Sequence, residues 1–219
     1  MQKTNGMAAS VRLWISNALL FAAGAAIGVF VWSVVRAAVD QRMDEWSFDR
    51  ERAAHARTEP PRVRPPAVAH GDVVGRLVIP RIHLRAMVRE GTDEDTLDVA
   101  LGHIKGTALP GETGNVGVAG HRDTLFRHLG EVGRDDVIQL QSLSATYVYR
   151  VDGIAIVKPE AVGVLAAGGR PQITLVTCYP FRYVGPAPKR YILKAHLESR
   201  IPGAVAQAGP SDGIPLANP

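Results

Sequence analysis

The sequence predicts a mainly β domain, built as a barrel or a sandwich, that follows a single N-terminal transmembrane helix. The first observation is one uncharged apolar run near the start of the chain. The second is a series of short strand-like segments after residue 71, separated by Gly and Pro turns and accompanied by little helix. At 219 residues the chain has room for one medium domain with appendages, and not for two full domains.

The apolar run extends from Leu13 to Val35, which is 23 residues without a charge. A helix of this length crosses a hydrocarbon core of about 30 Å. A cleaved signal peptide is the alternative, because Ala23–Ala25 is typical of a cleavage site, but the apolar residues continue for ten positions beyond it. The pattern favours an uncleaved anchor that contacts membrane lipid through residues 13–35. A short stub such as residues 1–12 usually stays in the cytoplasm, which places the rest of the chain outside the membrane.

The residues beyond the anchor divide into three parts. Residues 36–70 begin with a polar stretch rich in Ala, Arg, Glu and Asp and continue through Pro60–Pro66, which favours extended polyproline II. We therefore expect a stalk or linker that acts as a spacer. Residues 71–199 form the expected folded domain, which should fold without the anchor, and residues 200–219 form an expected disordered tail.

The net charge of +4 and the pI near 9.5 do not indicate a nucleic-acid-binding protein. The basic residues are scattered among acidic ones, and no stripe of aromatic and basic residues is present. The charge pattern predicts a solvated, mildly basic surface and no nucleic-acid partner. No acidic cluster indicates a calcium site, so we expect neither a metal nor a cofactor.

Short apolar or alternating segments predict the strands of the domain, with Gly and Pro turns between them. One short helix is expected after Thr92, whose side chain is a candidate N-cap. The expected strands are Val74–Ile82, Met87–Glu90, Asn115–Gly120, Val137–Gln141, Thr146–Lys158, Gln172–Cys178 and Arg190–Glu198.

Cys178 is the only cysteine, so an exported domain could not use it for an intramolecular disulfide. It closes the strand Gln172–Cys178, and Tyr179-Pro180 follows at once. A free cysteine is often a small buried hydrophobe. A thiol at a strand end beside a loop is instead placed like a nucleophile.

Two other side chains have complementary chemistry at strand ends. His121 follows the strand Asn115–Gly120, and its imidazole can accept a thiol proton and protonate a leaving amine. Arg190 opens the strand after Cys178, so a hairpin would place it beside the thiol, where its fixed donors can bind an oxyanion. Asp123 is a candidate either to orient His121 or to cap a turn, and His103 is expected to be structural or at the surface.

The segments around these residues resemble the sortase family. GTALPGETGNVGVAGHRDTLFR (residues 106–127) and TLVTCYPFRYVGPAPKRYIL (residues 174–193) are similar to the active-site segments of class D sortases. The resemblance spans residues 71–198. It implies an eight-stranded sortase β-barrel with short helices, in which the strands ending at His121 and Cys178 are parallel neighbours.

The resemblance also implies an activity. A cysteine transpeptidase would cleave an LPxTG-like sorting signal between Thr and Gly and transfer the acyl group to an amine of a peptidoglycan precursor or a protein lysine. Cys178 would be the nucleophile, His121 the acid/base and Arg190 the stabilising residue. Thr177 would contact the substrate, and residues 159–171 would form a wall of the groove. Within that wall, the apolar candidates to bind the signal are Val162, Val164 and Leu165.

Other classes of protein remain as alternatives. An exported, membrane-tethered β-barrel that only binds partners would carry the same anchor and a non-catalytic thiol. An L,D-transpeptidase would need a histidine two residues before the nucleophile, where Val176 stands. A papain-like protease would have its cysteine before its histidine in the chain, which is the reverse of the order here.

Overall fold

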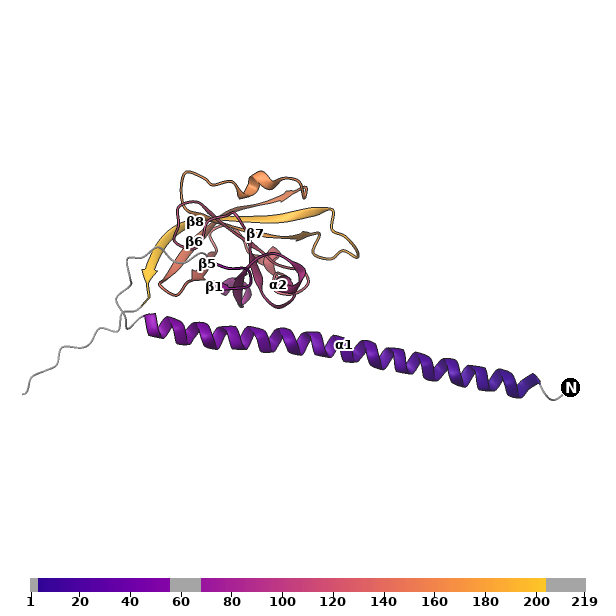
Figure 1. The fold of residues 1–219 in the computed structure, drawn as a ribbon. Coiled ribbons are helices and arrows are strands. Elements are labelled where there is room, and N and C mark those ends of the chain that lie inside the picture. The colour runs from indigo at the N-terminus through magenta and orange to yellow at the C-terminus, as the bar shows by residue number, and fades with distance from the viewer. Residues whose placement is uncertain (1–3, 56–67, 204–219) are drawn as a thin grey trace, which may run out of the picture. The chain divides into compact units, whose positions relative to one another are not determined.

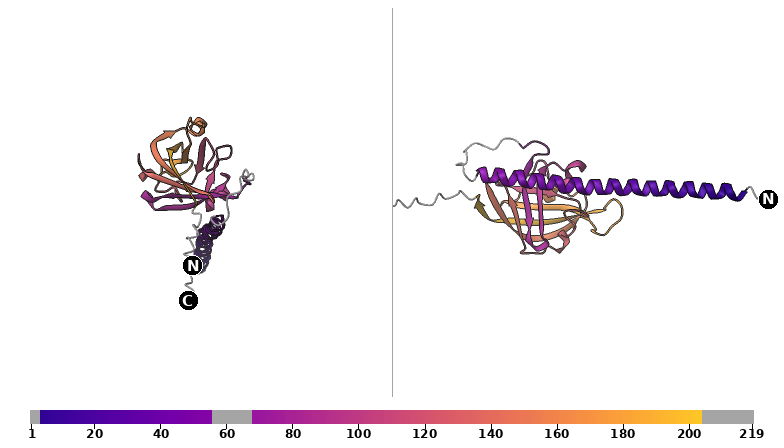
Figure 2. Two further views of the ribbon diagram at one scale, coloured as in Figure 1. Left: turned by 90° about the vertical axis from the view of Figure 1, so that its left-hand side faces the viewer. Right: turned by 90° about the horizontal axis from the view of Figure 1, so that it is seen from below.

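The computed structural model describes residues 4–55 and 68–203. The chain divides into two compact units, residues 1–40 and residues 41–219. The second unit contains an eight-stranded, closed, mixed β-barrel with few helices (Figure 1, Figure 2), which confirms the predicted fold class. The strands are β1 (Val73–Ile79), β2 (Leu84–Glu90), β3 (Leu101–His103), β4 (Asn115–Ala119), β5 (Val137–Gln141), β6 (Ala145–Val157), β7 (Gln172–Tyr179) and β8 (Lys189–Pro202).

The strands follow the order β1-β2-β3-β4-β7-β8-β6-β5 around the barrel, and β5 closes it by pairing with β1. The pairs β2/β3 and β4/β7 are parallel, and the other pairs are antiparallel. Alternate residues of the strands fill the interior with apolar side chains, because successive residues of a strand point to opposite faces. Fully buried members of this core include Leu77, Phe126, Leu140, Ile173, Leu175 and Leu193.

Several local details differ from the sequence-based expectations. The segment expected as one strand, Val74–Ile82, is strand only to Ile79 and ends in a 3-10 turn that contains Pro80. The short helix α2 (Glu94–Val99) is capped by Asp93, not by Thr92, because the Asp93 carboxylate accepts a hydrogen bond from the Thr96 amide. The three-residue strand β3 was not predicted.

The expected tail also begins later than residue 200. Strand β8 continues to Pro202, and its last residues pair with β6 through Arg200 opposite Tyr147, Ile201 opposite Thr146 and Pro202 opposite Ala145. Residues 204–219, which belong to the expected disordered tail, lie outside the described residues. Residues 56–67 of the expected linker also lie outside them.

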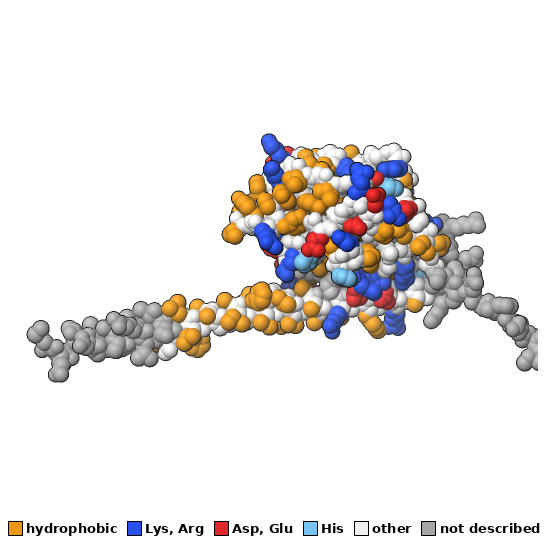
Figure 3. Space-filling model, turned by 180° about the vertical axis from the view of Figure 1, so that it is seen from behind, with side chains coloured by type: hydrophobic (Ala, Val, Ile, Leu, Met, Phe, Trp, Pro, Cys, Tyr) orange, Lys and Arg blue, Asp and Glu red, His pale blue; other side chains and the backbone are white. Residues whose placement is uncertain are grey.

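Helix α1 (Thr4–His55) contains the apolar run. Its segment Asn17–His55 is long and apolar enough to cross a membrane, and its most apolar stretch has a mean hydropathy of 2.3 with none of it buried. Figure 3 shows mainly apolar side chains along the described N-terminal part of the helix, and charged side chains toward its C-terminal end. The helix therefore fits the expected membrane anchor.

Residues 41–55, which we name the docking segment, contact the barrel. This differs from the expectation that residues 36–70 act only as a spacer. Acidic side chains of the segment face arginines of β1 and β2 at distances of 2.6 to 3.2 Å. The ion pairs are Asp44–Arg89, Glu45–Arg85 and Asp49–Arg76.

An apolar contact and a polar contact accompany these ion pairs. Phe48 is only 3% exposed, and the guanidinium of Arg76 lies 5.2 Å from the centre of its ring. Gln41 accepts a hydrogen bond from the Met87 amide at 3.1 Å and donates one to the Val99 carbonyl at 2.7 Å. The docking segment thus covers the outer face of β2, where Met87 is fully buried.

We predict that a chain of residues 71–219 melts about 5 °C or more below a chain of residues 41–219. Burial of a side chain such as Phe48 contributes about 2 kcal/mol, and 1 kcal/mol changes Tm by about 2–4 °C in a domain of this size. Circular dichroism during heating measures both transitions. In the longer chain, Phe48→Ala should lower Tm, whereas Trp46→Ala should not, because Trp46 is 67% exposed. Equal melting temperatures of the two chains would contradict this docking.

Candidate active site

The ends of the parallel strands β4 and β7 bring His121 beside Cys178. The register pairs Asn115 with Gln172 and Ala119 with Val176. Beyond the last paired residue, the Gly120 amide donates to the Val176 carbonyl at 3.2 Å, and the Thr177 hydroxyl donates to the Gly120 carbonyl at 2.7 Å. The ladder therefore continues past β4, and the next residue on each side is His121 and Cys178.

Strands β7 and β8 form the expected hairpin, in which Cys178 and Arg190 are directly opposite each other. Each of these residues lies three positions from a residue whose side chain belongs to the core, Leu175 in β7 and Leu193 in β8. Because side chains alternate between the faces of a strand, Cys178 and Arg190 both point to the outer face of the barrel. The structure thus brings the three positions together on adjacent strands in the order β4, β7, β8.

The segment after His121 is fixed by close packing. Gly120 has no room for a side chain, since an added Cβ would lie 2.6 Å from Leu101 and 2.7 Å from Phe126. The Phe126 amide donates to the His121 carbonyl at 3.1 Å, and the Phe126 ring is fully buried in the core. This packing holds the backbone of His121 at the end of β4.

A carboxylate that the sequence did not indicate faces His121. Its Nε2 lies 3.9 Å from Oδ1 of Asp98, which belongs to α2. Asp123 was the candidate for this place, but within the described residues Asp98 is the acidic residue paired with His121. Asp123 instead accepts two hydrogen bonds from Arg127 through its backbone carbonyl, at 3.1 and 2.8 Å.

An aromatic cluster lies next to Arg190, where the β7–β8 loop joins the two strands. Tyr191 stacks on Tyr179 with a centroid distance of 6.3 Å and contacts Phe181 edge-on at 5.1 Å. Burial, and to a lesser extent the neighbouring Tyr179, raises the pKa of Tyr191, so its phenol is neutral at ordinary pH. Nη1 of Arg190 donates to the carbonyls of Ala187 and Lys189 at 3.2 and 3.1 Å, which directs the guanidinium toward the loop above the cluster.

Thr177 does not have the position expected of a substrate contact. Its side chain is on the core-facing side of β7 and is only 2% exposed. Its hydroxyl is engaged with the Gly120 carbonyl. The residue therefore ties the ends of β4 and β7 together, and its side chain is not available to a substrate.

The three apolar candidates of the β6–β7 connection have different surroundings. They lie in the 3-10 turn Val162–Leu165. Only Leu165 lines a pocket of about 280 Å³, which the loop between β3 and β4 completes around Asn115. Val162 is 73% exposed. The pocket is near the start of β7, six residues from Cys178, or about 20 Å at the usual rise of a strand.

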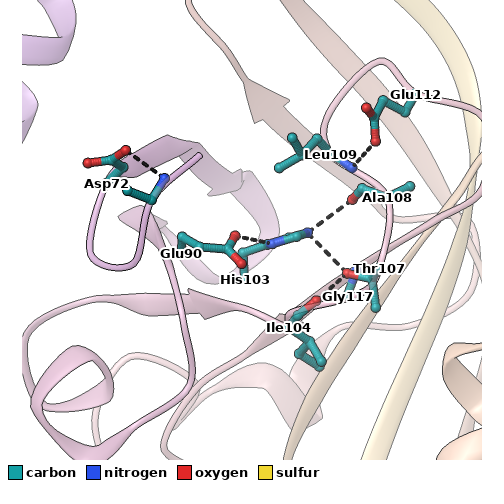
Figure 4. A network of polar contacts seen from close by, with 10 residues as sticks. Asp72, Glu90, His103, Ile104, Thr107, Ala108, Leu109, Glu112 and Gly117 are labelled. Carbon is teal, nitrogen blue, oxygen red and sulfur yellow. Dashed lines mark hydrogen bonds and ion pairs between the residues drawn. The ribbon is translucent and has the colours of Figure 1, made fainter. Parts of the chain in front are cut away.

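His103 is buried at the end of β3 and has a structural role (Figure 4). Its Nδ1 lies 2.5 Å from Oε2 of Glu90, and its Nε2 lies 3.0 Å from both the Ala108 carbonyl and the Thr107 hydroxyl. The Thr107 oxygen also accepts a hydrogen bond from the Gly117 amide in β4. These contacts attach the loop after β3 to the outer face of β4.

The structure thus places a thiol, an imidazole and a guanidinium at three adjacent strand ends of a closed mixed barrel. The sortase-domain model matches residues 77–198, which is more than half of the chain. The chain belongs to the sortase family.

Similar proteins agree with this assignment. Sortase D of Bacillus subtilis is 38% identical over 124 residues, which cover 56% of this chain and 63% of that protein. The chain thus spans somewhat less than two thirds of the length of this relative. The structure of a Clostridium perfringens Sortase D5 transpeptidase matches with a TM-score of 0.59 and 26% identity over 73% of this chain and 96% of that one. The SrtA sortase from Actinomyces oris matches with a TM-score of 0.60 and 29% identity over 74% and 100%.

Proposed function

We propose that this chain is a membrane-anchored cysteine transpeptidase that cleaves an LPxTG-like sorting signal between Thr and Gly. The observation that supports it is the register around Cys178, which is opposite Arg190 on one side and next to the ladder that ends at His121 on the other. Nucleophile, acid/base and oxyanion donor are the three groups that acyl transfer through a thiol requires.

The acylation step uses all three side chains. The imidazole of His121 accepts the thiol proton, and the Cys178 thiolate attacks the carbonyl carbon of the signal's Thr. The guanidinium of Arg190 stabilises the negative charge that develops on the carbonyl oxygen. Protonated His121 then gives its proton to the nitrogen of the Gly, the carbon–nitrogen bond breaks, and a thioester to Cys178 remains.

The second step resolves the thioester. A primary amine loses a proton to His121 and attacks the thioester carbonyl, so that an amide forms and the Cys178 thiol is regenerated. The acceptor is an amine of a peptidoglycan precursor or of a protein lysine. The apolar part of α1 holds the enzyme at the cell membrane, with the N-terminus in the cytoplasm and the barrel outside.

Mass spectrometry of the intact protein tests this proposal. The chain is mixed with a set of LPxTG-like peptides in the absence of an acceptor amine, and the reaction is stopped with acid. We expect a mass increase equal to the peptide up to and including its Thr, minus one water, that disappears on addition of hydroxylamine. A protein that binds the peptides without any covalent adduct would overturn the proposal and favour the binding-module alternative.

We further predict that Asp98→Asn lowers kcat for peptide cleavage about twofold to fivefold and leaves KM unchanged. The ion pair with His121 is solvent-exposed, and such pairs contribute up to about 1 kcal/mol. Steady-state kinetics of the purified chain measures both constants. Asp95→Asn is the matched control, because Asp95 is an exposed acid of the same helix that is not paired with His121. Equal kcat values for the two variants would show that Asp98 does not assist His121.

A further inference from the structure

The loop between β7 and β8, residues 180–188, connects the two strands that carry Cys178 and Arg190. It contains three prolines, and Gly185 has a positive φ of 95°. Within the part of the chain that the structure describes, no backbone–backbone hydrogen bond forms inside this loop. The loop also has an exposed tip, where Val184 is almost fully accessible. Its conformation therefore depends on contacts from outside the loop.

Arg122, the residue after His121, provides such contacts. Its Nη1 donates to the Pro180 carbonyl at 2.9 Å, and its Nη2 donates to the carbonyls of Tyr183 and Gly185 at 2.8 and 3.1 Å. The guanidinium also lies 5.7 Å from the centre of the Tyr183 ring. One side chain thus binds the beginning, the middle and the far half of the loop.

We propose that Arg122 is a positioning residue of the active site, which holds the β7–β8 loop against the end of β4. This inference rests on the proposed function. Arg122 is adjacent to His121 in the chain, and the loop leads from Cys178 to Arg190. The guanidinium therefore connects the segment that carries His121, after β4, to the loop that joins Cys178 in β7 to Arg190 in β8.

The number and direction of these contacts explain why arginine is suited to the task. A planar guanidinium presents several donors in fixed directions, so three carbonyls can be bound at once at a small cost in side-chain entropy. Lysine would keep the charge but would have a single rotating ammonium group. The aromatic cluster of Tyr179, Phe181 and Tyr191 holds the base of the loop, and Arg190 binds the Ala187 carbonyl. The segment around the tip is bound by Arg122, so it should become more mobile without that side chain.

The expected kinetic consequence is a loss in kcat. A loop that samples several conformations leaves fewer enzyme molecules with Arg190 and Cys178 correctly placed, and small misplacements of catalytic groups reduce rates strongly. In the full-length chain in detergent, we expect Arg122→Ala to lower kcat for LPxTG-like peptides about tenfold or more, with KM changed much less. Arg122→Lys should recover only part of the loss. Guanidinium ion at millimolar concentration should partly restore Arg122→Ala.

Arg127→Ala is the matched control. Arg127 is five residues from Arg122 and also binds a backbone carbonyl, but within the described residues both of its side-chain hydrogen bonds go to Asp123 and none goes to the loop. We expect its kcat to remain near that of the unmodified chain. All variants should melt at similar temperatures, since Arg122 is only partly buried and belongs to no part of the core.

A second measurement does not depend on activity. Trypsin can cleave the loop after Arg182, which is exposed, and mass spectrometry follows the appearance of that cut. We expect Arg122→Ala to be cleaved there several times faster than the unmodified chain or Arg127→Ala. Faster cleavage without any peptide turnover in any variant would refute the proposed function and leave the loop contact standing. Cleavage rates and kcat values equal to those of Arg127→Ala would overturn the inference.

Discussion

Cys178→Ala is expected to abolish cleavage of LPxTG-like peptides, with a loss of about ten-thousandfold or more, while the fold is retained. Removal of the nucleophile eliminates the thioester step, and the remaining groups provide only a small part of the rate. The side chain is partly exposed at the end of β7, so its loss leaves the core intact. Fluorescence of a quenched peptide measures the turnover, and circular dichroism measures Tm.

Two further measurements accompany this experiment. Iodoacetamide should inactivate the unmodified chain by alkylating its single thiol, and the peptide should slow that alkylation. Cys178→Ala should still bind the peptide, because the substitution removes only the thiol. Peptide cleavage by Cys178→Ala at the original rate would show that Cys178 is not the nucleophile, and an inert thiol would favour a β-barrel that only binds partners.

Strands with strong local patterns could be predicted from the sequence. The bounds of β5 were predicted at both ends, and those of β4, β6 and β7 were predicted within one residue. Their apolar residues alternate or run continuously, and turn residues mark their ends. The three-residue strand β3 has no such pattern, because Leu-Gly-His is too short to show a period.

The relative positions of Cys178, Arg190 and His121 were predicted, because they depend on one hairpin and on the ends of two neighbouring strands. The hairpin that places Arg190 opposite Cys178 follows from a short Pro- and Gly-containing loop between two strands. The parallel pairing of β4 with β7 came from the family resemblance. Contacts such as those of Asp98 with His121 or of Arg122 with Tyr183 join residues 23 and 61 positions apart, and no local pattern identifies such partners.

The docking segment was missed for the same physical reason. A helical segment with many charged residues is usually exposed to solvent. The sequence of the docking segment therefore does not reveal the partners of Asp44 or Asp49. Those partners, Arg89 and Arg76, lie on strands 45 and 27 residues away. The folded barrel places arginines on the outer face of β1 and β2. Only with their positions known can the acidic residues of the helix be assigned to partners.

Substitution of Arg190 should produce the second large effect. Lysine keeps the positive charge but loses the planar fork of donors, so Arg190→Lys separates geometry from charge. Loss of one good oxyanion donor typically costs on the order of a hundredfold in rate, or about 3 kcal/mol. We expect Arg190→Lys to lose most of the activity and Arg190→Ala nearly all of it, with little change in Tm.

The loss should appear in acylation, because an oxyanion develops in that transition state, and again when the amine attacks the thioester. Single-turnover mixing of enzyme and peptide, with the adduct counted by mass spectrometry, measures this rate directly. Arg200→Lys and Arg200→Ala are the matched controls, since Arg200 belongs to the same strand ten residues away and its guanidinium lies 6.0 Å from the centre of the Tyr147 ring. Full activity of Arg190→Lys would leave Arg190 a purely electrostatic role. Full activity of Arg190→Ala would remove it from the catalytic site and require another donor for the oxyanion.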